Sequence, residues 1–175
     1  MEMNTRLQVE HPVSEMVSKV DLVQQQFLVA QGKSIAQLPV RFDGHAIEVR
    51  VNAERVEVQD DGSLSFIPEP GYVGEVHFPE ETHVRVISSV EEGSLVPPYY
   101  DSMIAQIICW GSSRKEACAR MLDYLGRVRL EGISTNLALS RMILDDQNFL
   151  KGRFDTGFLK EFLKRIDANE LKSRI

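Results

Sequence analysis

Five side chains that could bind ligands alternate along the start of the chain, at Glu2, Asn4, Arg6, Gln8 and Glu10. A repeat of two residues is that of a β-strand, so an extended backbone would place all five on one face. Most residues between them are apolar, and we expect the opposite face to pack on a hydrophobic core. Eight residue steps of about 3.3 Å span roughly 26 Å, which is longer than a small ligand. This polar series must therefore serve two neighbouring subsites, unless the chain bends partway.

The residue types of the polar series suggest a division of the chemistry. Glu2 and Asn4 offer hard oxygen ligands of the kind that Mg²⁺ or Mn²⁺ prefers. Arg6 presents a planar fork that suits a carboxylate, bicarbonate or phosphate group. Glu10 could act as a general base on an anion bound near that arginine. From spacing alone, a charged edge strand with cross-strand ion pairs is an equally good interpretation.

Neighbouring elements must hold the polar series in place. Pro12 lacks a backbone donor and disfavours a helix before it, so the extended run should end there. A helix is predicted from about residue 14 or residue 20 to residue 31, with Gly32 as its stop. Residues 34–41 then form a connector.

The region from residue 42 to about residue 111 is predicted to be β. Gly and Pro residues separate short apolar stretches there, which is typical of strands joined by turns. The expected strands cover residues 46–51, 62–67, 74–78, 83–90 and 103–109. Helices are expected next, over residues 113–129, 136–145 and 157–166. The predicted fold class is α+β, with a small antiparallel sheet or sandwich followed by C-terminal helices.

Composition restricts the classes of partner. A net charge of −6 and a pI near 5.3 argue against nucleic acid or an anionic membrane as the main partner. No apolar run is long enough to span a membrane, and no signal-peptide pattern is present. Cys109 and Cys118 lack metal-ligand spacing and are expected to be reduced core residues. His45 and His77 have no partners at ligand spacing, so a zinc site is not expected.

Several motifs resemble those of the biotin carboxylase family. Residues 2–15 resemble the family signature, and the Gln-Val-Glu-His-Pro run at residues 8–12 is its most specific part. The shorter Glu-x-Asn-x-Arg core is shared with other ATP-grasp enzymes. Further matches follow in order over residues 44–54, 66–71, 96–105, 132–136, 149–152 and 155–159. The resemblance implies the tail of an ATP-grasp domain over residues 1–36 and a biotin carboxylase C-terminal domain over residues 37–175.

The resemblance also implies an activity. Biotin carboxylases are ATP-dependent ligases that carboxylate biotin on a carrier protein, with bicarbonate as the carbon source. ATP and Mg²⁺ or Mn²⁺ are the implied cofactors, with carrier-bound biotin as substrate. The metal would lie at Glu2 and Asn4, and Thr156 would approach the adenine edge of the nucleotide.

Individual roles in catalysis follow from the same resemblance. Arg6 would pair with bicarbonate, helped by Gln8 and the backbone of Val9, and Glu10 would act as base on bicarbonate. Arg85 lies where the family has an arginine on a strand that faces the active site. It would stabilise the negative charge on the ureido oxygen of deprotonated biotin. Without the resemblance, a cross-strand ion pair is the better interpretation of Arg85.

The implied partners are a biotin carboxyl carrier protein or domain, a carboxyltransferase component and a second copy of the chain in a homodimer. The implied location is the cytoplasm, or the mitochondrial matrix in a eukaryote. In the family, the nucleotide lid and the lysines that anchor ATP precede the point where this sequence starts. The chain alone is therefore expected not to carboxylate biotin. The final acceptor of the carboxyl group is not encoded in this region.

Two features depart from the family pattern. Gln106 stands where the family usually has lysine, and residues 55–65 form a longer stretch than usual, predicted as an inserted hairpin turned at residues 60–62. Two alternative functions stay open. One is a non-catalytic dimerisation or assembly module, and the other is a different ATP-grasp ligase, such as a carbamoyl-phosphate synthetase relative. Residues 8–12 and the Tyr-Tyr-Asp-Ser-Met block at residues 99–103 disfavour the latter.

Overall fold

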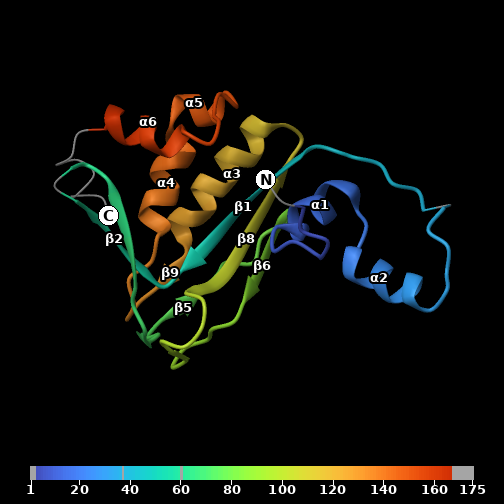
Figure 1. Ribbon diagram of the computed structural model, residues 1–175, viewed down its shortest axis with the longest axis horizontal. Helices are drawn as coiled ribbons and strands as arrows, with labels where there is room; N and C mark the ends of the chain where they lie inside the picture. Colours follow the sequence, from blue (N-terminus) through green and yellow to red (C-terminus); the bar gives the residue numbers. More distant parts are fainter. Residues whose placement is uncertain (1–2, 37, 60, 167–175) are drawn as a thin grey trace.

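A three-stranded antiparallel sheet forms the centre of the protein (Figure 1). The computed structural model describes residues 3–36, 38–59 and 61–166. The sheet contains β1 (His45–Asn52), β6 (Val84–Ser88) and β8 (Met103–Gly111), in the order β1-β8-β6. Residues 104–109 of β8 are all buried, and all but Gln106 are apolar, as expected of a strand that is covered on both faces.

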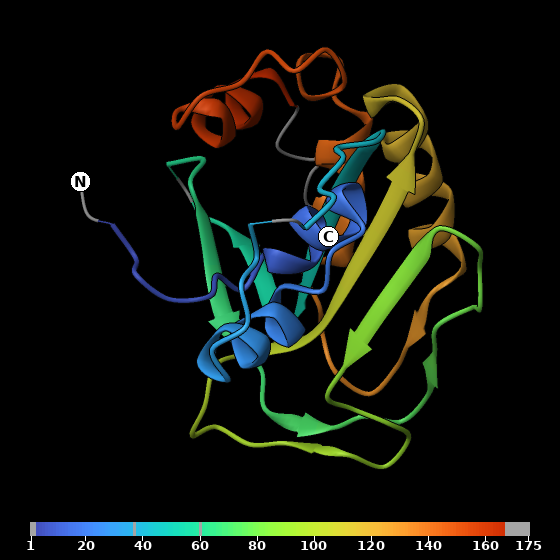
Figure 2. The same cartoon turned by 90° about the vertical axis from the view of Figure 1, so that its right-hand side faces the viewer.

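Different helices cover the two faces of this sheet. On one face, α3 (Arg114–Arg127) packs Met121 and Leu125 into the main core with Val49 and Ile107. On the other face, α1 (His11–Ser18) contacts β1 and β8 (Figure 2). Because side chains alternate along a strand, Gln106 points to the α1 face while its neighbour Ile107 points to the α3 face.

Smaller elements surround the sheet. β2 (Glu54–Val58) and β3 (Leu64–Pro68) form an antiparallel hairpin. β4 (Gly71–Tyr72) pairs with β7 (Leu95–Val96), and β5 (Val76–His77) pairs with β9 (Arg129–Leu130). The last helices are α4 (Leu137–Asp145), α5 (Gln147–Leu150) and α6 (Phe158–Arg165). A second core joins the hairpin to α4 and α6 through Val56, Leu139, Met142 and Phe162.

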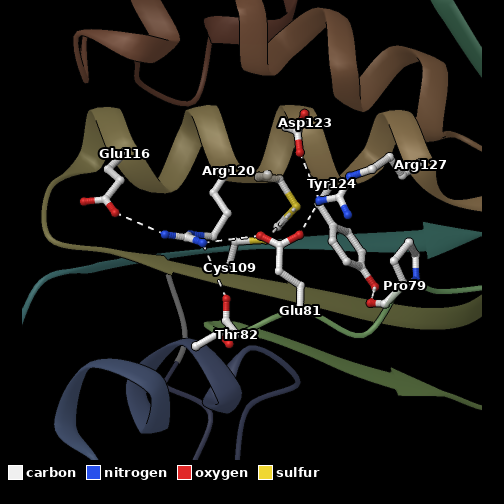
Figure 3. Close-up of polar contacts among 10 residues, drawn as sticks. Pro79, Glu81, Thr82, Cys109, Glu116, Arg120, Asp123, Tyr124 and Arg127 are labelled. Atoms are coloured by element: carbon white, nitrogen blue, oxygen red, sulfur yellow. Dashed lines mark hydrogen bonds and ion pairs between the residues drawn. The ribbon is translucent and has the colours of Figure 1, made fainter.

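A charged network fastens the loop before β6 to α3 (Figure 3). Glu81 accepts a hydrogen bond from Arg120 at 3.3 Å and also pairs with Arg127. Tyr124, which is fully buried, donates its hydroxyl proton to the carbonyl of Pro79 at 2.9 Å. These contacts fix the point at which the chain enters β6.

Most of the predicted elements are confirmed. The fold class is α+β with an antiparallel sheet, and the expected hairpin is formed by β2 and β3. Ser113 caps α3 by accepting from the Glu116 amide at 3.3 Å, and the helix ends at Arg127. Cys109 and Cys118 are buried and unpaired, as expected. The division of the chain at residue 36 stays a prediction. No helix in the described part of the chain is long and apolar enough to cross a membrane.

Two predictions about the first thirty residues are wrong. The expected strand over the polar series is absent, because residues 3–10 run as coil and turn. A strand needs a neighbour for its backbone hydrogen bonds, and among the described residues none lies beside this segment. The single helix expected up to residue 31 is two helices, α1 and α2 (Leu22–Ala30). Lys19 ends α1 in the left-handed conformation, with φ of 58°, and Asp21 caps α2 by accepting from the Gln24 amide.

Candidate functional site

The end of the polar series turns sharply into α1. The backbone amide of His11 donates to the carbonyl of Gln8 at 3.2 Å, and His11 Nδ1 lies 2.8 Å from the same oxygen. A carbonyl can only accept, so Nδ1 carries the proton in this contact. His11 therefore has a structural role: it closes the turn that presents Val9 and Glu10 to the sheet.

An ion pair joins Glu10 to the first strand of the sheet. Arg50 on β1 places Nη2 2.7 Å from Glu10 Oε2, and its Nε lies 3.3 Å from Glu48 Oε1. The Arg50 and Glu10 side chains are 46% and 55% exposed, so a ligand can reach their charged groups. Glu48 is only 6% exposed and holds the guanidinium from the inner side. The pair combines a base with a positive charge at an accessible position.

Gln106 connects the same turn to the middle strand. Its Nε2 donates to the carbonyl of Val9 at 2.9 Å and to Glu48 Oε1 at 3.1 Å. Gln106 is 8% exposed, and both of these contacts are partly buried. Glu48 Oε2 is buried and has no hydrogen-bond partner within the described residues.

Arg85 pairs with a carboxylate of α1, and its predicted role stays a prediction. Its Nη1 lies 2.7 Å from Glu15 Oε2, and Glu15 Oε1 accepts from the Leu22 amide at 2.8 Å. Glu15 is 8% exposed, so the contact links β6 to α1 and to the start of α2. The structure brings Arg50, not Arg85, into contact with Glu10.

The earlier residues of the polar series lie along a separate groove. Asn4 and Arg6 line a groove of about 640 Å³ with α2, together with Thr5, Leu7, Leu22, Gln25, Gln26, Val29, Ala30 and Ile35. Arg6 is exposed and, among the described residues, donates to the neighbouring carbonyl of Leu7 at 3.1 Å. Glu2 lies outside the described residues. The bend at residues 8–11 thus separates Asn4 and Arg6 from the Glu10 pair.

Thr156 lies in a different groove from Asn4 and Arg6. It lines a groove of about 660 Å³ between the β2–β3 hairpin and α6, with Leu64, Phe66 and Leu159 among its neighbours. The hairpin and α6 share the second core, so this groove belongs to that part of the molecule.

His45 contacts an arginine of α3. His45 Nε2 lies 3.2 Å from Arg114 Nη1, and partial burial together with the Arg114 charge lowers the pKa of His45. A neutral His45 that accepts from Arg114 fits these contacts. Within the described residues, no group of three or more His, Cys, Asp or Glu side chains could hold a metal ion.

Sequence reasoning missed Arg50, Glu48 and Gln106 as members of the site. The sequence of β1 could have indicated two of them. Glu48 and Arg50 alternate with the apolar residues Ile47, Val49 and Val51, so both lie on the same face of the strand. Polar residues that share a face of a half-buried strand need partners, and here the partner is the turn that carries Glu10.

Family models identify the chain. The model of the biotin carboxylase C-terminal domain matches residues 48–161. The chain belongs to the biotin carboxylase C-terminal domain family. The model of the carbamoyl-phosphate synthase L chain ATP-binding domain matches residues 1–38.

Known biotin carboxylases match along most of this chain. Identity is 43% with the biotin carboxylase of Haemophilus influenzae, over 97% of this chain and 36% of that protein. It is 44% with biotin carboxylase 1 of Bacillus subtilis, over 93% of this chain and 35% of that protein. The chain therefore spans about a third of the length of these relatives.

A solved structure agrees with the fold. The biotin carboxylase domain dimer of Hydrogenobacter thermophilus 2-oxoglutarate carboxylase, in complex with MgADP, ADP and bicarbonate, is 36% identical and superposes with a TM-score of 0.82. The match covers 95% of this chain and 36% of that one.

Proposed function

We propose that this chain supplies the bicarbonate site of an ATP-dependent biotin carboxylase, which carboxylates biotin on a carrier protein. The observation that carries the proposal is the accessible Glu10–Arg50 pair, with its charged atoms 2.7 Å apart. The relatives support it, because they are biotin carboxylases and one of them was solved with bicarbonate.

The proposed chemistry uses the base and the cations at the turn. A guanidinium, from Arg50 or Arg6, pairs with bicarbonate, and the Gln8 side chain and the backbone of Val9 complete its surroundings. Glu10 removes the proton of bicarbonate. A bicarbonate oxygen attacks the terminal phosphate of ATP, and ADP leaves. The resulting carboxyphosphate breaks down to CO₂ and phosphate, the phosphate takes the N1 proton of biotin, and the deprotonated N1 attacks CO₂ to form carboxybiotin.

The negative charge that develops on the ureido oxygen of biotin needs a cation. The sequence suggested Arg85 for this task, but Arg85 is already compensated by the nearly buried Glu15. Arg50 is held at the site of the base, and the side chains of Arg50 and Arg85 are 46% and 49% exposed. We therefore propose Arg85 and Arg50 as the two candidates for this task.

Nucleotide and metal are further parts of the proposal. Asn4 is exposed in the groove beside Arg6, so its carboxamide oxygen is open to a cation. Glu2 and Asn4 would hold Mg²⁺ or Mn²⁺, which neutralises charge on nucleotide phosphates when it is bound. The contact of Thr156 with adenine stays a prediction, because Thr156 lies in the hairpin groove.

The proposed partners follow the relatives. The dimer described for the Hydrogenobacter thermophilus domain supports a homodimer here. A biotin carboxyl carrier protein or domain and a carboxyltransferase component would deliver and use the carboxylated biotin. A cytoplasmic location stays a prediction.

The test is a substitution of Glu10 in the complete enzyme that contains this chain. Glu10→Gln keeps the size of the side chain and removes the base, so bicarbonate-dependent ATP hydrolysis should fall at least about a hundredfold. Glu57→Gln, an exposed carboxylate in the hairpin, is the matched control and should keep full activity. Turnover within about tenfold of the wild-type enzyme, or about 1.4 kcal/mol, would contradict the assignment of Glu10.

A further inference from the structure

Gln106 is a buried amide at the centre of an otherwise apolar strand. It lies on β8, where its backbone is paired with Arg50 on one side and Ile87 on the other. Buried polar side chains in strand interiors are stable only when they are hydrogen-bonded. Gln106 satisfies this condition with contacts that lead to the proposed base.

The contacts of Gln106 close a ring. Its Nε2 donates to Val9 O and to Glu48 Oε1, at 2.9 and 3.1 Å. Glu48 accepts from Arg50 Nε at 3.3 Å, and Arg50 Nη2 lies 2.7 Å from Glu10 Oε2. The peptide bond from Glu10 back to Val9 completes the ring. The side-chain amide of Gln106 therefore holds both the backbone next to Glu10, through Val9, and the side-chain partner of Glu10, which is Arg50, through Glu48.

Burial makes the inner half of this ring the rigid half. Gln106 is 8% exposed and the Glu48 side chain 6%, whereas Arg50 and Glu10 are about half exposed. Hydrogen bonds shielded from water are stronger than exposed ones, so the inner half sets the geometry of the outer half. The amide does this without adding charge, which leaves Arg50 as the only cation of the ring.

We propose that Gln106 is a positioning residue for the Glu10–Arg50 pair, holding the Glu10 backbone through Val9 and the Arg50 guanidinium through Glu48. The proposal rests on the proposed function in one respect, which is that bicarbonate binds at this pair. Because the Gln106 amide is a neutral donor, the charge of Glu48 is left to Arg50.

The first measurement is amide hydrogen exchange on the 175-residue protein. Gln106→Met keeps the length of the side chain and removes both donors. The amides of His11 and Val13, which bond to Gln8 O and Glu10 O, should exchange about tenfold faster. The amides of Ile107 and Cys109 should change less than about twofold if the sheet itself is intact. Gln59→Met, at an exposed glutamine of the hairpin turn, is the control.

The second measurement separates positioning from a general structural role. In the complete enzyme, Gln106→Met should raise the KM for bicarbonate about tenfold, a factor that corresponds to about 1.4 kcal/mol. The KM for ATP should stay within about twofold. A loss of folded enzyme would instead lower kcat and leave both KM values unchanged.

Two results overturn the proposal. One is unchanged hydrogen exchange at the amides of His11 and Val13. The other is faster exchange at these amides with an unchanged KM for bicarbonate in an active enzyme. If Gln106→Met does not fold, Gln106→Asn replaces it, because its amide is one methylene too short to reach both partners. A wild-type enzyme without bicarbonate-dependent activity contradicts the proposed function only, since the exchange result reports on the ring in either case.

Discussion

At the scale of single residues, two arginines with similar exposure have different surroundings. Arg50 contacts the half-exposed Glu10 through Nη2 and the nearly buried Glu48 through Nε, whereas Arg85 contacts the nearly buried Glu15. An accessible guanidinium next to a base can exchange its partner for a substrate anion. A guanidinium that neutralises a buried carboxylate cannot be moved without leaving that charge unpaired.

These surroundings predict different effects of two alanine substitutions on activity. Arg50→Ala in the complete enzyme should lower biotin carboxylation at least about a hundredfold. It should also lower stability, because the nearly buried Glu48 is then left with Gln106 as its partner among the described residues. Arg85→Ala should lower the free energy of unfolding by about 1–3 kcal/mol, because Glu15 is then left buried with a single partner. Activity assays and urea unfolding of both variants measure the two effects. Arg55→Ala removes an exposed ion pair with Glu57, so it should change stability by less than about 0.5 kcal/mol. A large loss of activity in Arg85→Ala with little loss in Arg50→Ala would support the role that the sequence suggested for Arg85.

At the scale of elements, the loop before β6 depends on α3 for its position. Glu81 contacts Arg120 and Arg127 at once, and Arg120 Nε is already buried without a partner among the described residues (Figure 3). Removing the carboxylate would leave Arg120 with Glu116 as its remaining ion-pair partner. The loop would then be held by the bonds from Tyr124 to the Pro79 carbonyl and from Arg120 to the Thr82 carbonyl.

Glu81→Ala should therefore destabilise the protein by about 1 kcal/mol or more, seen as a lower urea midpoint with an unchanged slope. Glu80→Ala, at the exposed neighbouring carboxylate, is the matched control and should be close to neutral. An equal effect of the two substitutions would show that general charge, and not the contact with α3, accounts for the loss.

Some helices and strands could be predicted from local sequence patterns, and others could not. β8 and α3 were predicted because a long apolar run and a capped amphipathic stretch carry their own signals. The break between α1 and α2 was not, because it depends on one residue, Lys19, in a left-handed conformation that sequence rarely reveals. The polar series has the alternation of a strand but lacks a partner strand among the described residues.

At the scale of the whole molecule, two buried groups of the main core predict alkaline unfolding. Burial raises the pKa of Cys109 to about 12 and the pKa of Tyr124 to about 12. The unfolded chain would release these protons near the ordinary values of 9 and 10, whereas the folded protein retains them. Stability from both groups is thus complete below pH 9 and is lost as the pH rises towards 12. The slope should reach about 1.4 kcal/mol per pH unit for each group, measured by urea unfolding between pH 8 and about pH 11. A constant free energy of unfolding over that range would contradict the burial of these groups.

The family, the fold class, most helices and strands, and Glu10 as a candidate base can all be recognised in the amino-acid sequence. Motifs, periodicity and capping residues are local, so they can be recognised without the fold. The partners of these residues depend on the folded structure. Glu10 and Arg50 are 40 positions apart, Glu15 and Arg85 are 70 apart, and Val9 and Gln106 are 97 apart. Each contact depends on which face β1, β6 and β8 turn towards α1. Strand register sets that face, and no local stretch of sequence encodes it.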